Sequence, residues 1–157
     1  MHPDHLYAEV QDISKEAHAG QKYGDKDYFS AHIESVSDKV AFLYEDDDDY
    51  EIIDNLSYLH DVREDSHFTE YDIRARLKGY DRLDELMEAL DAITKRPGES
   101  RDDYLKRCCA NSIAWKVKVA DTMSNLECSV ISNEKRRIIK YTTQIQKLYS
   151  FTDQNAA

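Results

Sequence analysis

Apolar residues recur along most of this 157-residue chain at intervals of three and four, the spacing of a helix buried on one face. Leu6, Val10, Ile13 and Ala17 form the first such stripe, and Gly20 follows at a position suited to ending a helix. The chain holds only four Gly and two Pro, fewer than the tight turns of an all-β sandwich usually require. The pattern therefore predicts an all-α fold.

Further helical segments follow without an internal repeat or a linker between them. Thr69 stands three residues before Asp72, which is typical of a capping box, and we expect Asn133 to cap the last helix. The spacing predicts one compact helical bundle of about seven or eight helices over residues 1–151, with a frayed tail at 152–157. The predicted segments after the first are 33–43, 52–59, 69–77, 83–93, 102–110, 112–130 and the helix after 133.

The charge balance limits the classes of partner. Lys and Arg total 21 and Asp and Glu total 32, so the formal net charge is −11, which disfavours binding to nucleic-acid polymers. A small anionic substrate remains compatible with this charge if a metal or local cations reverse the field in one cleft. No apolar run reaches the roughly 18–20 residues of a membrane-spanning helix, and residues 1–10 lack the apolar core of a signal peptide. An odd number of cysteines, two of them adjacent, is a poor disulfide framework, so we expect a cytoplasmic protein without membrane partners.

The segment from 58 to 66 concentrates residues that can act on a metal or on water. If it is helical, Glu64 lies one turn after His60, and Asp65 lies one turn after Asp61. Stacking an acidic pair on a His-Asp pair is costly unless a cation binds there. The alternative is an ordinary helix end with a solvated charged face.

A second polar stripe runs along the predicted helix over 112–130. Asn111, Trp115, Lys118, Asp121 and Asn125 are separated by steps of four, three, three and four, so they share one helical face. The positions that flank this face are apolar and are expected to be buried. The stripe either faces water or lines a site, and the apolar flanks favour a site wall.

A third element is the run His18-Ala-Gly-Gln21, which His32 follows in the chain. The order of one histidine, an adjacent His-Asp pair and a distant aspartate resembles the ligand order of the HD superfamily of metal-dependent phosphohydrolases. Within it, the chain most resembles the small alarmone hydrolases and the hydrolase domain of RelA/SpoT-type enzymes, from about Ala17 to Leu126. The matching positions are Ala17–Gln21, His32, Val36, Leu59–Asp65, Thr69, Asp72, Ile73, Tyr104, Leu105, Val117–Asp121, Asn125 and Leu126.

The resemblance implies an HD-type helical bundle with one divalent cation, which is manganese in this family. The implied ligands are His32, His60, Asp61 and Asp121. Two imidazoles and two carboxylates suit manganese or iron, although they also admit cobalt or zinc.

The resemblance also implies an activity and its residues. Glu64 and Asp65 match the pair that orients and activates the attacking water, and Lys118 and Asn125 match positions near the phosphate and ribose of the substrate. The implied reaction is hydrolysis of the 3′-pyrophosphate of (p)ppGpp, which releases pyrophosphate and GDP or GTP.

The chain departs from the family on the side of the nucleotide base. Where the family has an Arg-Lys cluster near guanine, this chain has Lys22 and Tyr23, which we expect to contact the substrate. Tyr28–Ile33 replaces the family's Pro-Tyr-Ile-x-His-Pro. A tyrosine can stack on a base but cannot supply the contact of a guanidinium. Two alternatives therefore stay open: a related phosphohydrolase acting on the NADPH 2′-phosphate or a nucleoside monophosphate, and a non-catalytic module that binds a nucleotide or a partner.

Two tyrosines of the last predicted helix bear on assembly. Tyr141 and Tyr149 form a candidate surface for homo-oligomer formation, whereas ordinary packing within one chain is the simpler interpretation of tyrosines on a helix.

Overall fold

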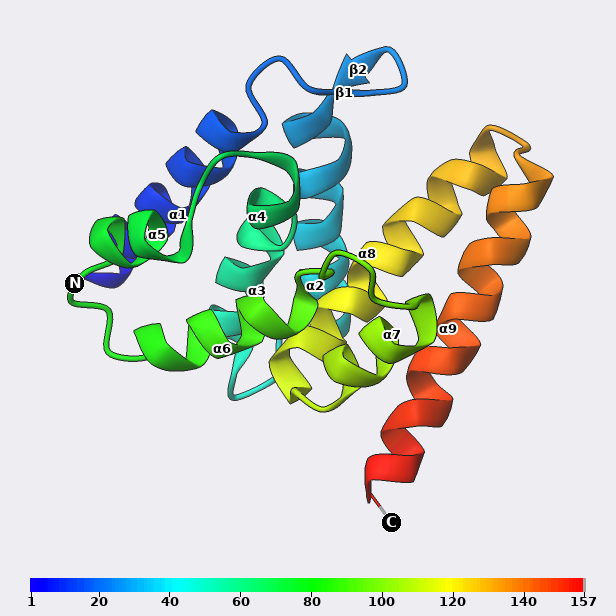
Figure 1. The fold of residues 1–157 in the computed structure, drawn as a ribbon. Helices are drawn as coiled ribbons and strands as arrows, with labels where there is room; N and C mark the ends of the chain where they lie inside the picture. Colours follow the sequence, from blue (N-terminus) through cyan, green and yellow to red (C-terminus); the bar gives the residue numbers. More distant parts are fainter. Residues whose placement is uncertain (157) are drawn as a thin grey trace.

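The computed structural model describes residues 1–156 and consists almost entirely of helices, which confirms the predicted all-α class (Figure 1). Within this range eight α-helices have seven or more residues, in line with the seven or eight expected. Their bounds are α1 Pro3–Ala17, α2 Glu34–Tyr44, α3 Tyr50–Leu59, α5 Glu70–Arg76, α6 Leu83–Ile93, α7 Arg101–Cys109, α8 Ser112–Ile131 and α9 Lys135–Ala156.

Three short elements were not predicted from the sequence. A two-stranded antiparallel hairpin, β1 Lys22–Tyr23 and β2 Lys26–Asp27, connects α1 to the π-helix η1, Phe29–Ile33. A single turn, α4 Val62–Asp65, follows α3. The hairpin has only two residues in each strand, and the other two elements are single turns, so none of them carries a periodic signal.

Helix α8 is the central element of the bundle. It packs against α2, α3, α6, α7 and α9, and Figure 1 shows α9 lying along α8 at one side of the molecule. Val117 and Ala120 of α8 and Ile53, Leu56 and Leu59 of α3 are fully buried, so the apolar stripes of the sequence meet in one core.

Local signals explain where several helices begin and end. The side chain of Asn111 accepts a hydrogen bond of 2.9 Å from the backbone N–H of Ala114 and caps α8. Thr69 and Asp72 form the expected capping box at the start of α5. Asn133 does not cap the last helix as expected, because it closes α8 in the left-handed conformation, with φ of 54°. Helix α9 includes residues 152–156 of the expected tail, and residue 157 lies outside the described residues.

Among residues 1–156, none of the helices combines the length and the apolar character needed to cross a bilayer.

The core predicts a clear contrast between two substitutions. Leu56 is fully buried, whereas the side chain of Phe42 on α2 is 79% exposed. Leu56→Ala should lower the free energy of unfolding by about 2–5 kcal/mol through lost burial and a residual cavity. Phe42→Ala should change it by less than about 0.5 kcal/mol. Urea denaturation followed by circular dichroism measures both, and equal losses would contradict this description of the core.

Candidate metal centre

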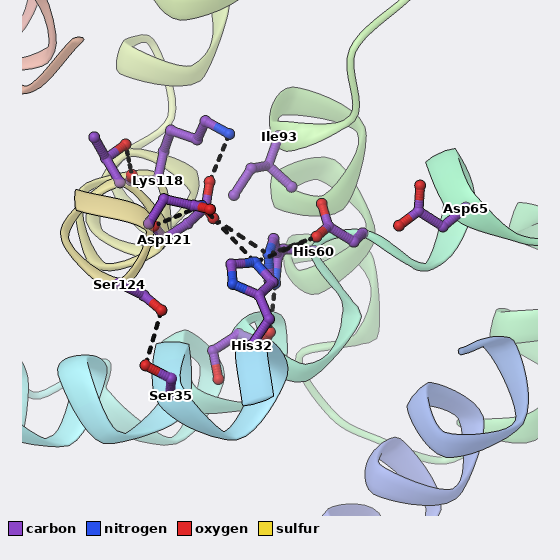
Figure 2. A network of polar contacts seen from close by, with 12 residues as sticks. His32, Ser35, His60, Asp65, Ile93, Lys118, Asp121 and Ser124 are labelled. Carbon is purple, nitrogen blue, oxygen red and sulfur yellow. Dashed lines mark hydrogen bonds and ion pairs between the residues drawn. The ribbon is translucent and has the colours of Figure 1, made fainter. Parts of the chain in front are cut away.

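Three side chains from separate parts of the chain converge in the interior of the bundle. His32 comes from η1, His60 follows the last residue of α3, and Asp121 comes from the middle of α8. All three are buried, and one ligand atom from each lies within 4.8 Å of the others (Figure 2). This His32–His60–Asp121 group could hold a metal ion.

A hydrogen bond from Nδ1 of His60 to the backbone orients the ring so that Nε2 faces the group. Nδ1 lies 2.6 Å from the carbonyl oxygen of Ser57, and because a carbonyl only accepts, Nδ1 must carry the proton. Nε2 then presents its lone pair to the group, is buried, and makes no hydrogen bond of good geometry. A buried imidazole nitrogen without a donor is costly, and a cation would satisfy it, so the donor set fits a metal.

Asp61 borders this group. Its Oδ2 lies 3.1 Å from Nε2 of His60 and 3.6 Å from Nε2 of His32. It also accepts a hydrogen bond of 2.6 Å from the hydroxyl of Tyr28. The fourth residue of the predicted ligand set therefore lies against both histidines, outside the compact group of three that includes Asp121.

Asp121 is held as a charged carboxylate by its neighbours on α8. Lys118 Nζ donates to its Oδ2 at 2.7 Å, and Asn125 Nδ2 donates to its Oδ1 at 2.8 Å. Burial alone would raise the pKa of Asp121, but the charge of Lys118 and the bond to His32 outweigh it and lower that pKa. Asp121 is thus ready to bind a cation without first losing a proton.

His32 occupies the position between the two carboxylates. Its Nε2 lies 3.2 Å from Oδ1 of Asp121 and 3.6 Å from Oδ2 of Asp61. Burial opposes its charged form, yet the bonds to Asp121 and Asp61 dominate and raise the pKa of His32 to about 10. In the metal-free protein a proton on His32 therefore supplies the positive charge that a bound ion would replace.

The predicted catalytic pair lies on the turn α4 that follows Asp61, and its two members have different partners. The carboxylate of Glu64 accepts the backbone N–H of Lys95, in the loop after α6. Burial of the carboxyl group and the nearby charges of Asp61 and Asp65 raise the pKa of Glu64. Asp65 accepts a bond of 2.8 Å from Gln21, and Figure 2 shows it beyond His60, away from Lys118.

His18 belongs to the support of Asp65. Gln21 must turn its amide nitrogen to the carboxylate of Asp65, so its oxygen accepts from Nδ1 of His18 at 2.8 Å. The buried His18 therefore fixes Gln21, which fixes Asp65. His18 and Gln21 match the family motif, but the resemblance implied no role for either residue.

Two cavities are lined by residues of the centre or by a residue in contact with them. A pocket of about 210 Å³ is bordered by His32, Asp61 and Asp121 together with three cationic side chains, Arg101, Lys118 and Lys140. A second cavity of about 520 Å³ lies between the hairpin and the C-terminal half of α8.

Arg137 of α9 lines the larger cavity and was missed by the sequence analysis. Its Nη2 donates to the hydroxyl of Tyr23 at 3.0 Å, and that hydroxyl donates to Asn125 Oδ1 at 2.8 Å. The family motifs end near Leu126, before α9, so spacing alone could not connect Arg137 to position 23. Lys22, a predicted substrate residue, is exposed on β1 and borders neither cavity.

Comparison with known proteins adds no family to this description. No protein-family model matches the chain, and a search of curated proteins gives no significant match.

We predict that metal binding depends on the group of three. A divalent ion should raise the melting temperature of the wild type, because a ligand at about 100 times its Kd adds about 2.7 kcal/mol of stability. His60→Ala should abolish that rise, whereas His5→Ala, an exposed histidine of α1, should preserve it. Scanning calorimetry with Mn²⁺ or Co²⁺ measures the effect, and an equal rise in both variants would place the metal elsewhere.

A second prediction concerns protons. Because the pKa of His32 is raised to about 10, its ion pairs stabilise the metal-free fold fully below the ordinary pKa of about 6.5, and this contribution is lost as the pH rises through about 10. An ion must displace this proton, so metal affinity should rise from about pH 7 to about pH 9. Calorimetric titration in two buffers of different ionisation enthalpy should show release of about one proton or more. Affinity independent of pH would contradict the assignment.

Proposed function

We propose that this protein is an HD-type, metal-dependent phosphohydrolase that removes the 3′-pyrophosphate of (p)ppGpp. The observation that carries the proposal is the buried His32–His60–Asp121 group, which opens on a pocket with three cationic side chains. A buried site of this kind is suited to a cation and an anionic substrate together, despite the acidic charge of the whole chain.

Manganese is the metal of the proposal, because imidazole and carboxylate ligands suit it and the family resemblance implies it. When bound, such an ion lowers the pKa of a coordinated water and polarises a phosphoryl oxygen. His32, His60 and Asp121 would hold it, with Asp61 beside both histidines as the fourth ligand.

Glu64 and Asp65 are proposed to handle the attacking water. The raised pKa of Glu64 brings this carboxyl group closer to neutral pH, where a general base works best. Gln21 donates to one oxygen of Asp65, which fixes the carboxylate and leaves its other oxygen able to orient a water.

The cations around the smaller pocket are proposed to contact the transferred phosphates. Lys118 is buried and lies 2.7 Å from Asp121, so its charge is held beside the metal ligands. Arg101 and Lys140 border the same pocket from α7 and α9. Positive groups held beside a reacting phosphate stabilise the charge that develops on phosphoryl oxygens during transfer.

The larger cavity is proposed to take the nucleoside. The ring of Tyr23 offers a stacking surface, and Arg137 supplies from α9 the guanidinium that the family carries at position 23. Carboxylates of Asp25, Glu127 and Glu134 also line this cavity. The pairing edge of guanine presents two adjacent N–H donors, whereas that of adenine presents one donor beside an acceptor nitrogen, so carboxylates favour a guanine nucleotide over NADPH.

The deciding experiment is a pyrophosphate-release assay on ppGpp with added Mn²⁺. Wild type should turn the substrate over, and Asp61→Ala and Glu64→Gln should each lower kcat/KM by about 100-fold or more. Glu64→Gln should still bind Mn²⁺, because Glu64 lies outside the metal group. Tyr7→Phe removes a hydroxyl that contacts Tyr58 outside the centre, so it serves as the control with normal activity.

The other outcomes identify the competing functions. Turnover of NADPH or a mononucleotide without turnover of ppGpp would keep the phosphohydrolase class and reject the alarmone substrate. Bound metal with no turnover of any nucleotide, or no bound metal at all, would favour the non-catalytic binding module.

A further inference from the structure

Tyr28 contacts the metal centre from a position where the resembled family has proline. Its hydroxyl donates to Oδ2 of Asp61 at 2.6 Å, and its side chain borders the same 210 Å³ pocket as His32 and Asp121. Proline has no hydroxyl group, so a chain with the family's residue at this position could not make this contact.

The surroundings of Tyr28 fix the direction of its hydroxyl. Its backbone N–H donates to the carbonyl oxygen of Gln21 at 3.0 Å, which ties the hairpin to the start of η1. Its ring lies 4.9 Å from the ring of His18 and 5.2 Å from the ring of His32, measured between centroids. A phenol held on two sides has few rotamers open to it, so the hydroxyl stays directed at Asp61.

The π-helical turn explains why Tyr28 and His32 act on the same carboxylate. The two residues are four positions apart, close to one turn of η1, so both side chains project from the same side toward Asp61. Isolated π-helical turns occur frequently at functional sites.

Asp61 depends on this contact more than Asp121 depends on any single partner. Asp121 receives bonds from Lys118 and Asn125 in addition to its contact with His32. Among residues 1–153, whose side chains the structure describes, Tyr28 is the only one besides the two histidines with a hydrogen bond or ion pair to the carboxylate of Asp61. The Asp61 side chain is also 20% exposed, against 7% for Asp121, so it has more freedom to turn away.

We propose that Tyr28 is a positioning residue of the metal centre, whose hydroxyl holds the carboxylate of Asp61 against His32 and His60 as the fourth ligand. The inference rests on the metal site of the proposed function and does not depend on the substrate. Partners of this kind typically change metal affinity by about 10-fold to 100-fold when they are removed.

The test is a comparison of Tyr28→Phe with wild type by titration with Co²⁺, followed both calorimetrically and by the visible absorption of the bound ion. Phenylalanine keeps the ring contacts with His18 and His32 and removes only the hydroxyl. We expect affinity to fall by about 10-fold to 100-fold and the absorption spectrum to change, since the spectrum reports ligand geometry. Tyr7→Phe should bind Co²⁺ as wild type does, and without Co²⁺ its melting temperature should agree with that of wild type.

A double-mutant cycle then shows whether the effect passes through Asp61. In an Asp61→Ala background, Tyr28→Phe should cause no further loss of affinity. Equal affinity and spectrum for wild type and Tyr28→Phe, or an undiminished loss in the Asp61→Ala background, would overturn the positioning role while the metal site stands. A wild type that binds no Co²⁺ would overturn the metal site itself.

Discussion

The structure depends on the way the buried charge of Asp121 is balanced. A carboxylate in the interior of a helical bundle is strongly destabilising unless cations and hydrogen-bond donors surround it. Lys118, His32 and Asn125 meet this need from α8 and η1, and His60 adds a second imidazole 3.8 Å away. Helix α8 also packs against five other helices. The helix at the centre of the core therefore also carries the buried carboxylate at the centre of the site.

The charges of the two aspartates in the centre are balanced by the protonation of His32. Two histidines and two aspartates stay together because a proton on His32 supplies positive charge between the carboxylates. A divalent cation would replace that proton. It would also bind Nε2 of His60, which makes no hydrogen bond of good geometry among the described residues.

Cationic side chains gather near the centre in spite of the acidic charge of the whole chain. The chain carries a net charge of −11, yet Arg101, Lys118 and Lys140 meet around one small pocket, and Arg137 lines the cavity beside it. Two of these four cations lie on α9, outside the region of family resemblance. An acidic protein can thus present a local positive field to an anionic ligand, because a bound ligand lies close to these cations while exposed charges farther away are largely screened by salt.

The sequence by itself determined the all-α class and the core stripes, because helical periodicity is a local property of the chain, whereas His32, His60, Asp61 and Asp121 were expected together only through the family resemblance. Only the tertiary structure decided that Asp61 borders the group, that Glu64 turns toward Lys95, and that Arg137 reaches Tyr23. Such contacts join residues from different helices, and their geometry follows from how the helices pack, which no local pattern encodes.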